Sequence, residues 1–465
     1  MPFNTALKTI LGEHGVLTAP EDRAPFERDW RGLAQNPAVA VALPHTTAQV
    51  SKIIKLCAAH GVAIVPQGGN TGLAAGSVPT QGGNQLILSL TRLNLIRALD
   101  TASDTITVEA GVTLQAIREA AAAQNRLFPV SFGAEGSAQA GGIISTNAGG
   151  MQVLSYGSIR AQVLGLEVVL ADGRIWNGLK SLRKDNTGLD LKQLFIGAEG
   201  TLGIITAATM RLHPAITTST SALIGVANIT AALTLFQSLR ARSGPALTLC
   251  EFIDGPAMHL GAAHTPGAHL PFTASAYVLA EISAPDAAAT LEDLLAQALE
   301  SGLATDAVIA QSTAQAQNFL AMREAISEGE LREGGAIKHD IAVPLAALPE
   351  TVAAIESLVA ANYPGCRLNI FGHLGDGNLH INLRPPAGQT LAALAKRKVA
   401  ITAKIEAIAT ARSGSFSAEH GIGQFRLPGM RTHKSAVELD LMRAIKTALD
   451  PQNLFNPGKM IPEKD

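Results

Sequence analysis

The N-terminal half of the chain alternates short apolar runs with amphipathic stretches. Apolar runs bounded by glycine, proline and small polar residues predict strands at 38–43, 62–66, 86–90, 105–109, 164–170 and 204–212. Apolar residues spaced three and four apart predict helices at 6–14, 46–60 and 113–123. An irregular arm is expected up to Trp30, residues 67–72 carry too many glycines for regular structure, and 133–157 form a second glycine-rich interval.

After Pro214 the pattern changes. Strands are predicted at 222–226, 247–252, 276–282, 307–310, 340–343 and 368–371, and they alternate with long helices at 229–241, 287–301, 348–361 and 391–411, before a tail that includes 437–449. This mixture indicates an α+β domain with helices on one face of an antiparallel sheet. Neither an internal repeat nor a low-complexity linker is evident, so the domains are expected in tight contact.

Two alternating runs flank Asp376-Gly377, a dipeptide that favours a two-residue hairpin turn. That turn places His373 directly opposite His380, with Cβ atoms roughly 5 Å apart. Asn382 falls on the same face, since side chains alternate along a strand. Two imidazoles this close could hold a divalent metal together with a third ligand. The alternative is a pair of surface or packed histidines.

The glycine-rich intervals suggest a second kind of chemistry. The loop 68–72 follows a short strand and could form a nest of backbone N–H groups around a pyrophosphate, or a tight structural turn. It has neither the Gly-x-Gly-x-x-Gly spacing of a dinucleotide fold nor the Gly-Lys-Ser/Thr of a Walker A loop. Residues 141–150 again place small polar residues between glycines. Two such loops favour a long ligand with a diphosphate.

Composition narrows the function classes. A chain of 465 residues suits two or three domains, and a net charge of −2 implies no polyanionic partner. Aromatic residues make up 4%, too few for stacking platforms that bind single-stranded nucleic acid. The three cysteines are far apart in sequence, which suits a reducing compartment and argues against an iron–sulfur cluster. With no signal peptide and no apolar run of about 18 residues, we expect a soluble cytoplasmic protein.

Six motifs occur in an order that resembles a known family. They are Pro-Gln-Gly-Gly-Asn-Thr-Gly (66–72), Thr-Asn-Ala-Gly-Gly (146–150), Ala-Glu-Gly-Thr-Leu-Gly-Ile-Ile-Thr (198–206), Gly-His-Leu-Gly-Asp-Gly-Asn-Leu-His (372–380), Ser-Ala-Glu-His-Gly-Ile-Gly (417–423) and Asn-Pro-Gly-Lys (456–459). The set is similar to FAD-linked 2-hydroxy-acid dehydrogenases of the vanillyl-alcohol-oxidase/p-cresol-methylhydroxylase type, most of all to D-2-hydroxyglutarate dehydrogenases. The resemblance covers nearly the whole chain from about Trp30.

This resemblance implies an α+β fold with a two-part FAD-binding domain of the p-cresol-methylhydroxylase type. Residues 1–214 would bind FAD, 215–421 would form an α+β substrate and metal domain, and 422–465 would return to the FAD domain. The flavin contacts it implies are Pro66, Gly68, Gly69, Asn70, Thr71, Gly72, Gly76, Ser77, Ser137, Gly141, Gly142, Asn147, Gly149, Gly150, Gly203 and Ile204. No histidine or cysteine lies in the first loop to tether a flavin, so noncovalent FAD is expected.

The same resemblance assigns a catalytic set. It implies a metal on His373, His380 and Glu419, with His420 as the base. Imidazole and carboxylate ligands suit zinc or manganese. The substrate contacts that it implies are Arg323, Ser327, Lys338 and Asn382.

The expected reaction removes the hydroxyl proton and transfers a hydride from C2 to flavin N5. Two cationic contacts favour a dicarboxylate such as D-2-hydroxyglutarate, with D-lactate, D-malate or glycolate as alternatives. An electron-transfer flavoprotein or a quinone would accept the electrons, and a homodimer is expected from base rates. Two other classes stay open: a metal-dependent hydrolase with purely structural glycine loops, and a nonredox flavin or nucleotide-binding protein.

Overall fold

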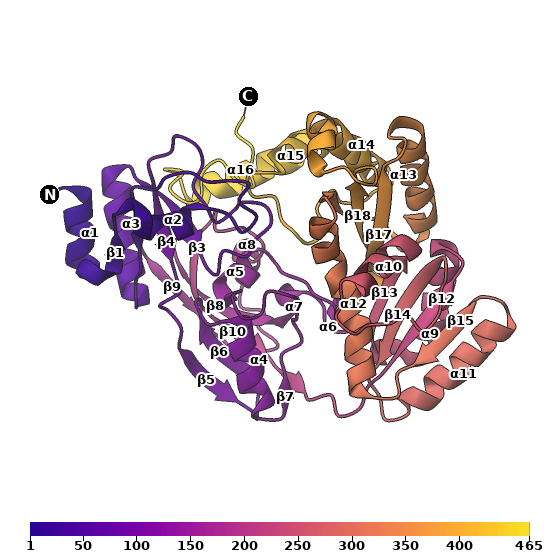
Figure 1. Ribbon diagram of the computed structural model, residues 1–465. Coiled ribbons are helices and arrows are strands. Elements are labelled where there is room, and N and C mark those ends of the chain that lie inside the picture. Colours follow the sequence, from indigo (N-terminus) through magenta and orange to yellow (C-terminus); the bar gives the residue numbers. More distant parts are fainter. Residues whose placement is uncertain (465) are drawn as a thin grey trace. The chain divides into compact units, whose positions relative to one another are not determined.

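The computed structural model, which describes residues 1–464, divides into two compact units (Figure 1). Unit 1 contains residues 1–150, 156–215 and the segment from Glu419 onward, and unit 2 contains residues 151–155 and 216–418. The two chain ends therefore belong to the same unit, and the polypeptide enters unit 2 and leaves it again.

Unit 1 is built on two main sheets. The first has the order β1 (Val16–Leu17), β2 (Ala40–Ala42), β4 (Gln85–Ser89), β3 (Ala63–Gln67), and β4 runs parallel to β2 and β3. The second is antiparallel, in the order β5 (Ile96–Asp100), β6 (Thr105–Glu109), β10 (Ile204–Arg211), β8 (Val163–Val169), β9 (Ile175–Gly178), and a short pair joins β7 (Arg126–Leu127) to β11 (His213–Pro214). The helices are α1 (Phe3–Leu11), α2 (Pro20–Glu27), α3 (Thr47–His60), α4 (Leu114–Ala122), α5 (Ala140–Ser145), α7 (Ile159–Gln162), α8 (Lys192–Phe195), α15 (Leu427–His433) and α16 (Ala436–Leu449).

Unit 2 contains one seven-stranded antiparallel sheet. Its order is β15 (Asp306–Ile309), β12 (Thr220–Val226), β14 (Ala276–Ile282), β13 (Leu247–Asp254), β17 (Arg367–His373), β18 (Asn378–Arg384), β16 (Ile337–Ala342). The helices are α9 (Ile229–Ser243), α10 (Gly255–Ala263), α11 (Ala287–Glu300), α12 (Thr313–Arg332), α13 (Leu348–Asn362) and α14 (Lys398–Thr410), while the short α6 (Val153–Tyr156) lies at the unit boundary. Both α+β character and an antiparallel sheet were predicted, and both are confirmed.

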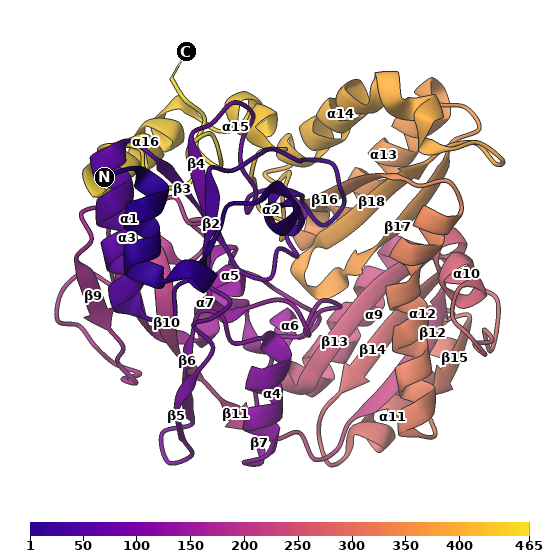
Figure 2. The same cartoon turned by 60° about the vertical axis from the view of Figure 1, so that its left-hand side comes forward.

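Helices cover both faces of this sheet, so the prediction of helices on one face alone was wrong. The large core packs α9, α11, α13 and α14 on one face. On the other face, α10 and α12 pack on β12, β13 and β14 and on Phe371 of β17. Figure 2 shows α12 alongside these strands. The central strands are buried on both sides, which explains their nearly continuous apolar runs.

The sequence missed several elements. Helix α2 replaces the expected irregular arm, α5 lies inside the glycine-rich interval, and α10 and β5 were not predicted. Helix α12, which spans Thr313–Arg332, was not predicted either.

The predicted hairpin exists, but its register differs by two residues. His380 pairs with Phe371 rather than His373, and Asn382 pairs with Asn369. The chain makes a 3-10 turn over Leu374–Asp376, and only Gly377 then takes a positive φ, of 72°. Because a shift of two residues preserves the face, His373 and His380 still lie on one side, with ring centroids 5.9 Å apart.

Candidate functional site

One face of β16, β17 and β18 carries a row of polar side chains, whereas most side chains on the opposite face are apolar. Alternate residues of these strands place Asn369, Asn382 and Lys338 in one row, each paired with its neighbour across the strands. Glu330 of α12, which is fully buried, accepts hydrogen bonds from Asn369 Nδ2 (2.9 Å) and Asn382 Nδ2 (3.0 and 2.9 Å). Lys338 Nζ lies 3.2 Å from the same carboxylate. Two predicted substrate contacts, Lys338 and Asn382, therefore meet at a residue that the sequence did not single out.

Arg323, a third predicted substrate contact, is held by another buried carboxylate. Its Nε donates to Glu251 Oε2 (2.7 Å), and Glu251 Oε1 accepts from His373 Nδ1 (2.5 Å). Burial raises the pKa of the Glu251 carboxyl, but Arg323 and His373 outweigh burial and hold that pKa well below its usual range. The guanidinium also lies over the Phe371 ring, 5.1 Å from its centroid.

The rest of the Arg323 guanidinium is available. Among the described residues Arg323 makes one ion pair, through Nε, so its two terminal nitrogens are left for another carboxylate. Ser327, predicted beside it, is exposed on α12 one turn further on.

The candidate metal ligands lie near the edge strand β16, on the same polar face of the sheet. Asp340 pairs with His380 across β16 and β18, and Asp340 Oδ1 lies 3.8 Å from His380 Nδ1. The backbone N–H of Ala418 donates to the Asp340 carbonyl (3.1 Å). Glu419 and His420 follow Ala418 directly, and consecutive Cα atoms are about 3.8 Å apart, so chain connectivity keeps both near Asp340.

Asp340, His380, Glu419 and His420 can each offer one ligand atom within 4.8 Å of the others. Ligands about 2.1 Å from an ion lie at most about 4.2 Å apart, so a small contraction would complete a site with nitrogen and oxygen donors. Of the three predicted ligands, His380 and Glu419 belong to this group, whereas His373 lies outside it and is bonded to Glu251. Asp340 is a residue that the sequence reasoning missed.

The two glycine segments of unit 1 lie against each other. A Cβ on Gly69 would lie 1.7 Å from Ser137 O, and one on Gly68 would lie 3.7 Å from Gly142 N. A Cβ on Gly72 or Gly142 would meet no atom within 4 Å, so open space adjoins both loops. Within residues 1–464 no hydrogen bond is donated by the backbone N–H groups of 68–72. Free donors beside open space fit the diphosphate of FAD.

The predicted flavin contacts gather on three stretches of unit 1. Strand β3 and the loop after it carry Pro66, Gly68, Gly69, Asn70, Thr71, Gly72, Gly76 and Ser77. Helix α5 and the residues around it carry Ser137, Gly141, Gly142, Asn147, Gly149 and Gly150. The start of β10 carries Gly203 and Ile204. The side chains of Asn70 and Asn147 bond within the protein, to Arg28 O and Ser77 Oγ and to Ser158 Oγ and Arg160 N. Ile204 is 1% exposed and belongs to the core, so only its backbone could face a ligand.

The C-terminal segment of unit 1 is bound to the first glycine loop. Lys459 Nζ donates to Gly76 O (3.0 Å) and to Asn456 Oδ1 (2.6 Å). The Glu199 carboxylate accepts from two backbone N–H groups of that segment, at Ile422 and Gly423, both at 2.7 Å. Burial raises the pKa of Glu199 and lowers the pKa of Lys459 to about 7. The segment after Glu419 therefore holds Gly76, itself a predicted flavin contact, and Glu199, which is close in sequence to two others.

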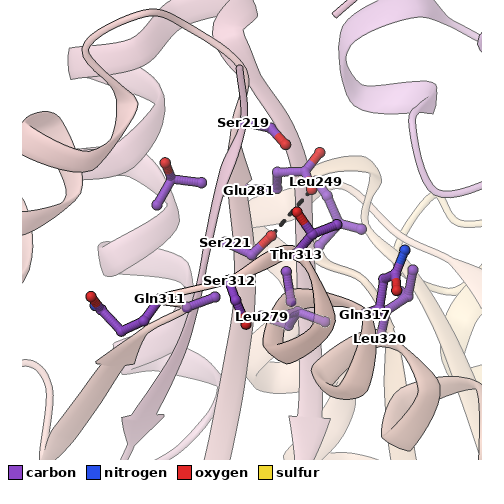
Figure 3. Close-up of a pocket in the computed structure, with 13 residues that line it drawn as sticks. Ser219, Ser221, Leu249, Leu279, Glu281, Gln311, Ser312, Thr313, Gln317 and Leu320 are labelled. Carbon is purple, nitrogen blue, oxygen red and sulfur yellow. Dashed lines mark hydrogen bonds between the residues drawn. The ribbon is translucent and has the colours of Figure 1, made fainter. Parts of the chain in front are cut away.

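A separate cavity of about 320 Å³ lies in unit 2 between the sheet and the start of α12 (Figure 3). Leu249, Leu279 and Leu320 line its apolar part, and Ser221 donates to the Glu281 carboxylate at 3.1 Å. It contains none of the predicted site residues, so it is not the site of the chemistry described above.

Comparison with known proteins gives the family. A model described as FAD binding domain matches residues 38–178, and one described as FAD linked oxidases, C-terminal domain, matches residues 217–460. A probable D-2-hydroxyglutarate dehydrogenase, mitochondrial, from Oryza sativa subsp. indica is 39% identical over 465 residues, which cover 98% of this chain and 81% of that protein. The chain belongs to the FAD-linked oxidase family.

A second relative of this FAD-linked oxidase is the D-2-hydroxyglutarate dehydrogenase of Xanthomonas citri pv. viticola, 38% identical over 453 residues, covering 96% of this chain and 94% of that one. The solved p-cresol methylhydroxylase with substrate bound has a TM-score of 0.76 at 18% identity, covering 100% of this chain and 97% of the other. The predicted fold type, the FAD cofactor and the oxidoreductase class are thereby confirmed.

The location of this FAD-linked oxidase stays a prediction. The rice relative is named as mitochondrial, so a cytoplasmic location does not follow from the family. Within residues 1–464, no helix is both long enough and apolar enough to cross a membrane.

Proposed function

We propose that this flavoenzyme oxidises a D-2-hydroxy acid to the 2-oxo acid, with D-2-hydroxyglutarate as the preferred substrate. Relatives from a plant and a bacterium carry that substrate in their names. The observation that carries the proposal is Arg323, held through Nε on the polar sheet face with its terminal nitrogens available. Lys338 on the same face supplies a second positive charge, which suits a second carboxylate.

Each group has a distinct role. When bound, FAD accepts the hydride from C2 and a divalent ion lowers the pKa of the substrate hydroxyl. Arg323 binds one carboxylate through two parallel N–H bonds and so orients C2, while Lys338 binds the carboxylate at the other end of the acid. Asn382 donates to Glu330 and so helps to hold the carboxylate that positions Lys338. His420 accepts the hydroxyl proton, since imidazole is the side chain best suited to proton transfer near neutral pH.

The finer assignments complete the proposal. His380 and Glu419, with Asp340 or His373, hold the ion, which is zinc or manganese. FAD is bound without a covalent link, because residues 66–77 contain neither histidine nor cysteine. An electron-transfer flavoprotein or a quinone accepts the electrons, and the protein acts in the cytoplasm as a homodimer.

Anaerobic spectroscopy tests this function. The purified protein is mixed with the D and L forms of 2-hydroxyglutarate, malate and lactate and with glycolate, while oxidised-flavin absorbance is followed. Fast bleaching by D-2-hydroxyglutarate above all others is expected. Bleaching by another acid alone would overturn the substrate assignment, and a colourless protein that takes up no FAD would overturn the function and favour a hydrolase.

The base is tested in the same assay. His420→Ala is expected to bind FAD normally yet lose turnover by about 100-fold or more. His269→Ala, an exposed histidine elsewhere, is the matched control and should behave as the unaltered protein. Normal turnover in His420→Ala would remove His420 from the role of base.

A further inference from the structure

Glu251 is a buried carboxylate without an assigned role. It lies on β13 in the middle of the seven-stranded sheet, and its side chain is 1% exposed. Neighbouring side chains on the same face of β12, β13 and β14 include Leu249, Ile253 and Leu279. A buried ion pair commonly adds no more stability than apolar side chains of similar volume would. Stability of unit 2 therefore does not account for a carboxylate at this position.

The two oxygens of Glu251 hold two different groups. Oε2 accepts from Arg323 Nε at 2.7 Å, and Oε1 accepts from His373 Nδ1 at 2.5 Å. A carboxylate only accepts, so Nδ1 of His373 carries a proton, and Nε2 is the one ring nitrogen that could serve as a metal ligand. Contact through the Arg323 Nε likewise leaves both terminal nitrogens of that guanidinium available to a second acceptor.

We propose that Glu251 is a positioning residue that orients the His373 imidazole toward the ion and the Arg323 guanidinium toward the substrate carboxylate. The inference rests on the proposed function, in which these two groups take part. Carboxylates that accept from the second nitrogen of a metal-binding histidine fix the ring and its tautomer. Here the same carboxylate also fixes the substrate-binding arginine, so its loss must weaken both kinds of binding.

Three variants separate this role from a general effect on folding. Glu251→Gln keeps the shape, but its amide nitrogen donates, so one of the two donors loses its acceptor. Glu251→Asp keeps the charge on a shorter side chain. Glu281→Gln is the matched control, because Glu281 lies on the same sheet face of neighbouring β14 and accepts from the hydroxyls of Ser221 and Thr248, not from a cation or an imidazole.

Two binding constants are measured without turnover. Zn²⁺ is titrated into chelator-treated protein with bound FAD, and 2-oxoglutarate is titrated while the flavin difference spectrum is followed. For Glu251→Gln we expect Zn²⁺ binding about 10- to 100-fold weaker and 2-oxoglutarate binding about tenfold weaker or more. Glu251→Asp should recover part of both losses, and Glu281→Gln should match the unaltered protein.

The inference is overturned if Glu251→Gln binds both Zn²⁺ and 2-oxoglutarate within twofold of the unaltered protein. It is also overturned if only one of the two binding constants changes. If Glu251→Gln does not fold, the decision passes to Glu251→Asp, which should then show smaller losses in both constants. Variants Arg323→Ala and His373→Ala separate this inference from the proposed function. Unchanged 2-oxoglutarate binding in the first would refute the proposed substrate site, and unchanged Zn²⁺ binding in the second would remove His373 from the proposed ligand set and leave Asp340 in its place.

Discussion

Glu330 offers a quantitative test of the polar sheet face. It accepts from the side-chain amides of Asn369 and Asn382, which are 0% and 2% exposed. The Oδ1 atoms of both asparagines are buried and have no partner among the described residues. The two substitutions Glu330→Ala and Glu330→Gln should therefore differ strongly, although both remove the charge.

The magnitudes follow from these contacts. Glu330→Ala leaves two buried amide donors without an acceptor, at about 1–3 kcal/mol each, so the loss of stability is on the order of 4 kcal/mol. In Glu330→Gln, Oε1 still accepts from one asparagine, and a flip of the other amide lets Gln donate to its unpartnered Oδ1. That loss should be about 1 kcal/mol. Lys338 adds little in either variant, since it is 34% exposed and can turn to water.

Differential scanning calorimetry of the FAD-loaded protein measures the difference. For a unit of about 200 residues, each kcal/mol corresponds to about 2–4 °C in Tm, so Glu330→Ala should unfold on the order of 10 °C lower and Glu330→Gln about 3 °C lower. Glu328→Ala is the control, because Glu328 is an exposed residue of the same helix that forms an ion pair with Arg332. This substitution should change Tm by about 1 °C. Equal losses in the alanine and glutamine variants of Glu330 would refute the reasoning.

Three further outcomes are expected. Gly69→Ala should lose bound FAD and thermal stability, because its Cβ would lie 1.7 Å from Ser137 O. Gly133→Ala is the control and should retain both, since a Cβ there meets no atom within 4 Å. Normal flavin absorbance in Gly69→Ala would contradict this expectation. Burial and nearby Arg211 lower the pKa of His213 to about 4, so its stabilisation is present above pH 6.5 and is lost as the pH falls toward 4. Tm of His213→Gln should therefore fall less over that range, and parallel Tm profiles would argue against the shift. Asp340→Asn should bind Zn²⁺ about tenfold more weakly in chelator competition, and unchanged binding would remove Asp340 from the ligand set.

Local periodicity predicted the hairpin face but not its register. The alternation along 369–373 and 378–382 put His373, His380 and Asn382 on one side, and a two-residue slip leaves that side unchanged. The slip arises because the chain makes a 3-10 turn at Leu374–Asp376 instead of a two-residue turn. The Asp376-Gly377 dipeptide does not distinguish the 3-10 turn from the two-residue turn, since Gly377 takes a positive φ in both.

The missed residues depend on strand order, which the sequence does not encode locally. Asp340 reaches the candidate metal site only because β16 is the neighbour of β18, and Glu251 reaches His373 only because β13 is the neighbour of β17. By contrast, α10 had a usable signal. Asp254 precedes Gly255-Pro256 and accepts from Ala257 N at 2.7 Å, the arrangement of an acidic N-cap before a proline in the first turn.

In the proposed function, the charge pattern of this sheet face governs how the acid is bound. Both cationic side chains are paired with buried carboxylates, Arg323 with Glu251 and Lys338 with Glu330. Each pair is neutral overall, so attraction at distances beyond about 10 Å is small. Selectivity must then come from the directions of the remaining N–H groups, which exist only while the carboxylates hold the cations in place. At the proposed site the buried carboxylates would thus contribute to specificity by geometry. Their charges are already balanced by Arg323 and Lys338, which would limit repulsion of an anionic substrate.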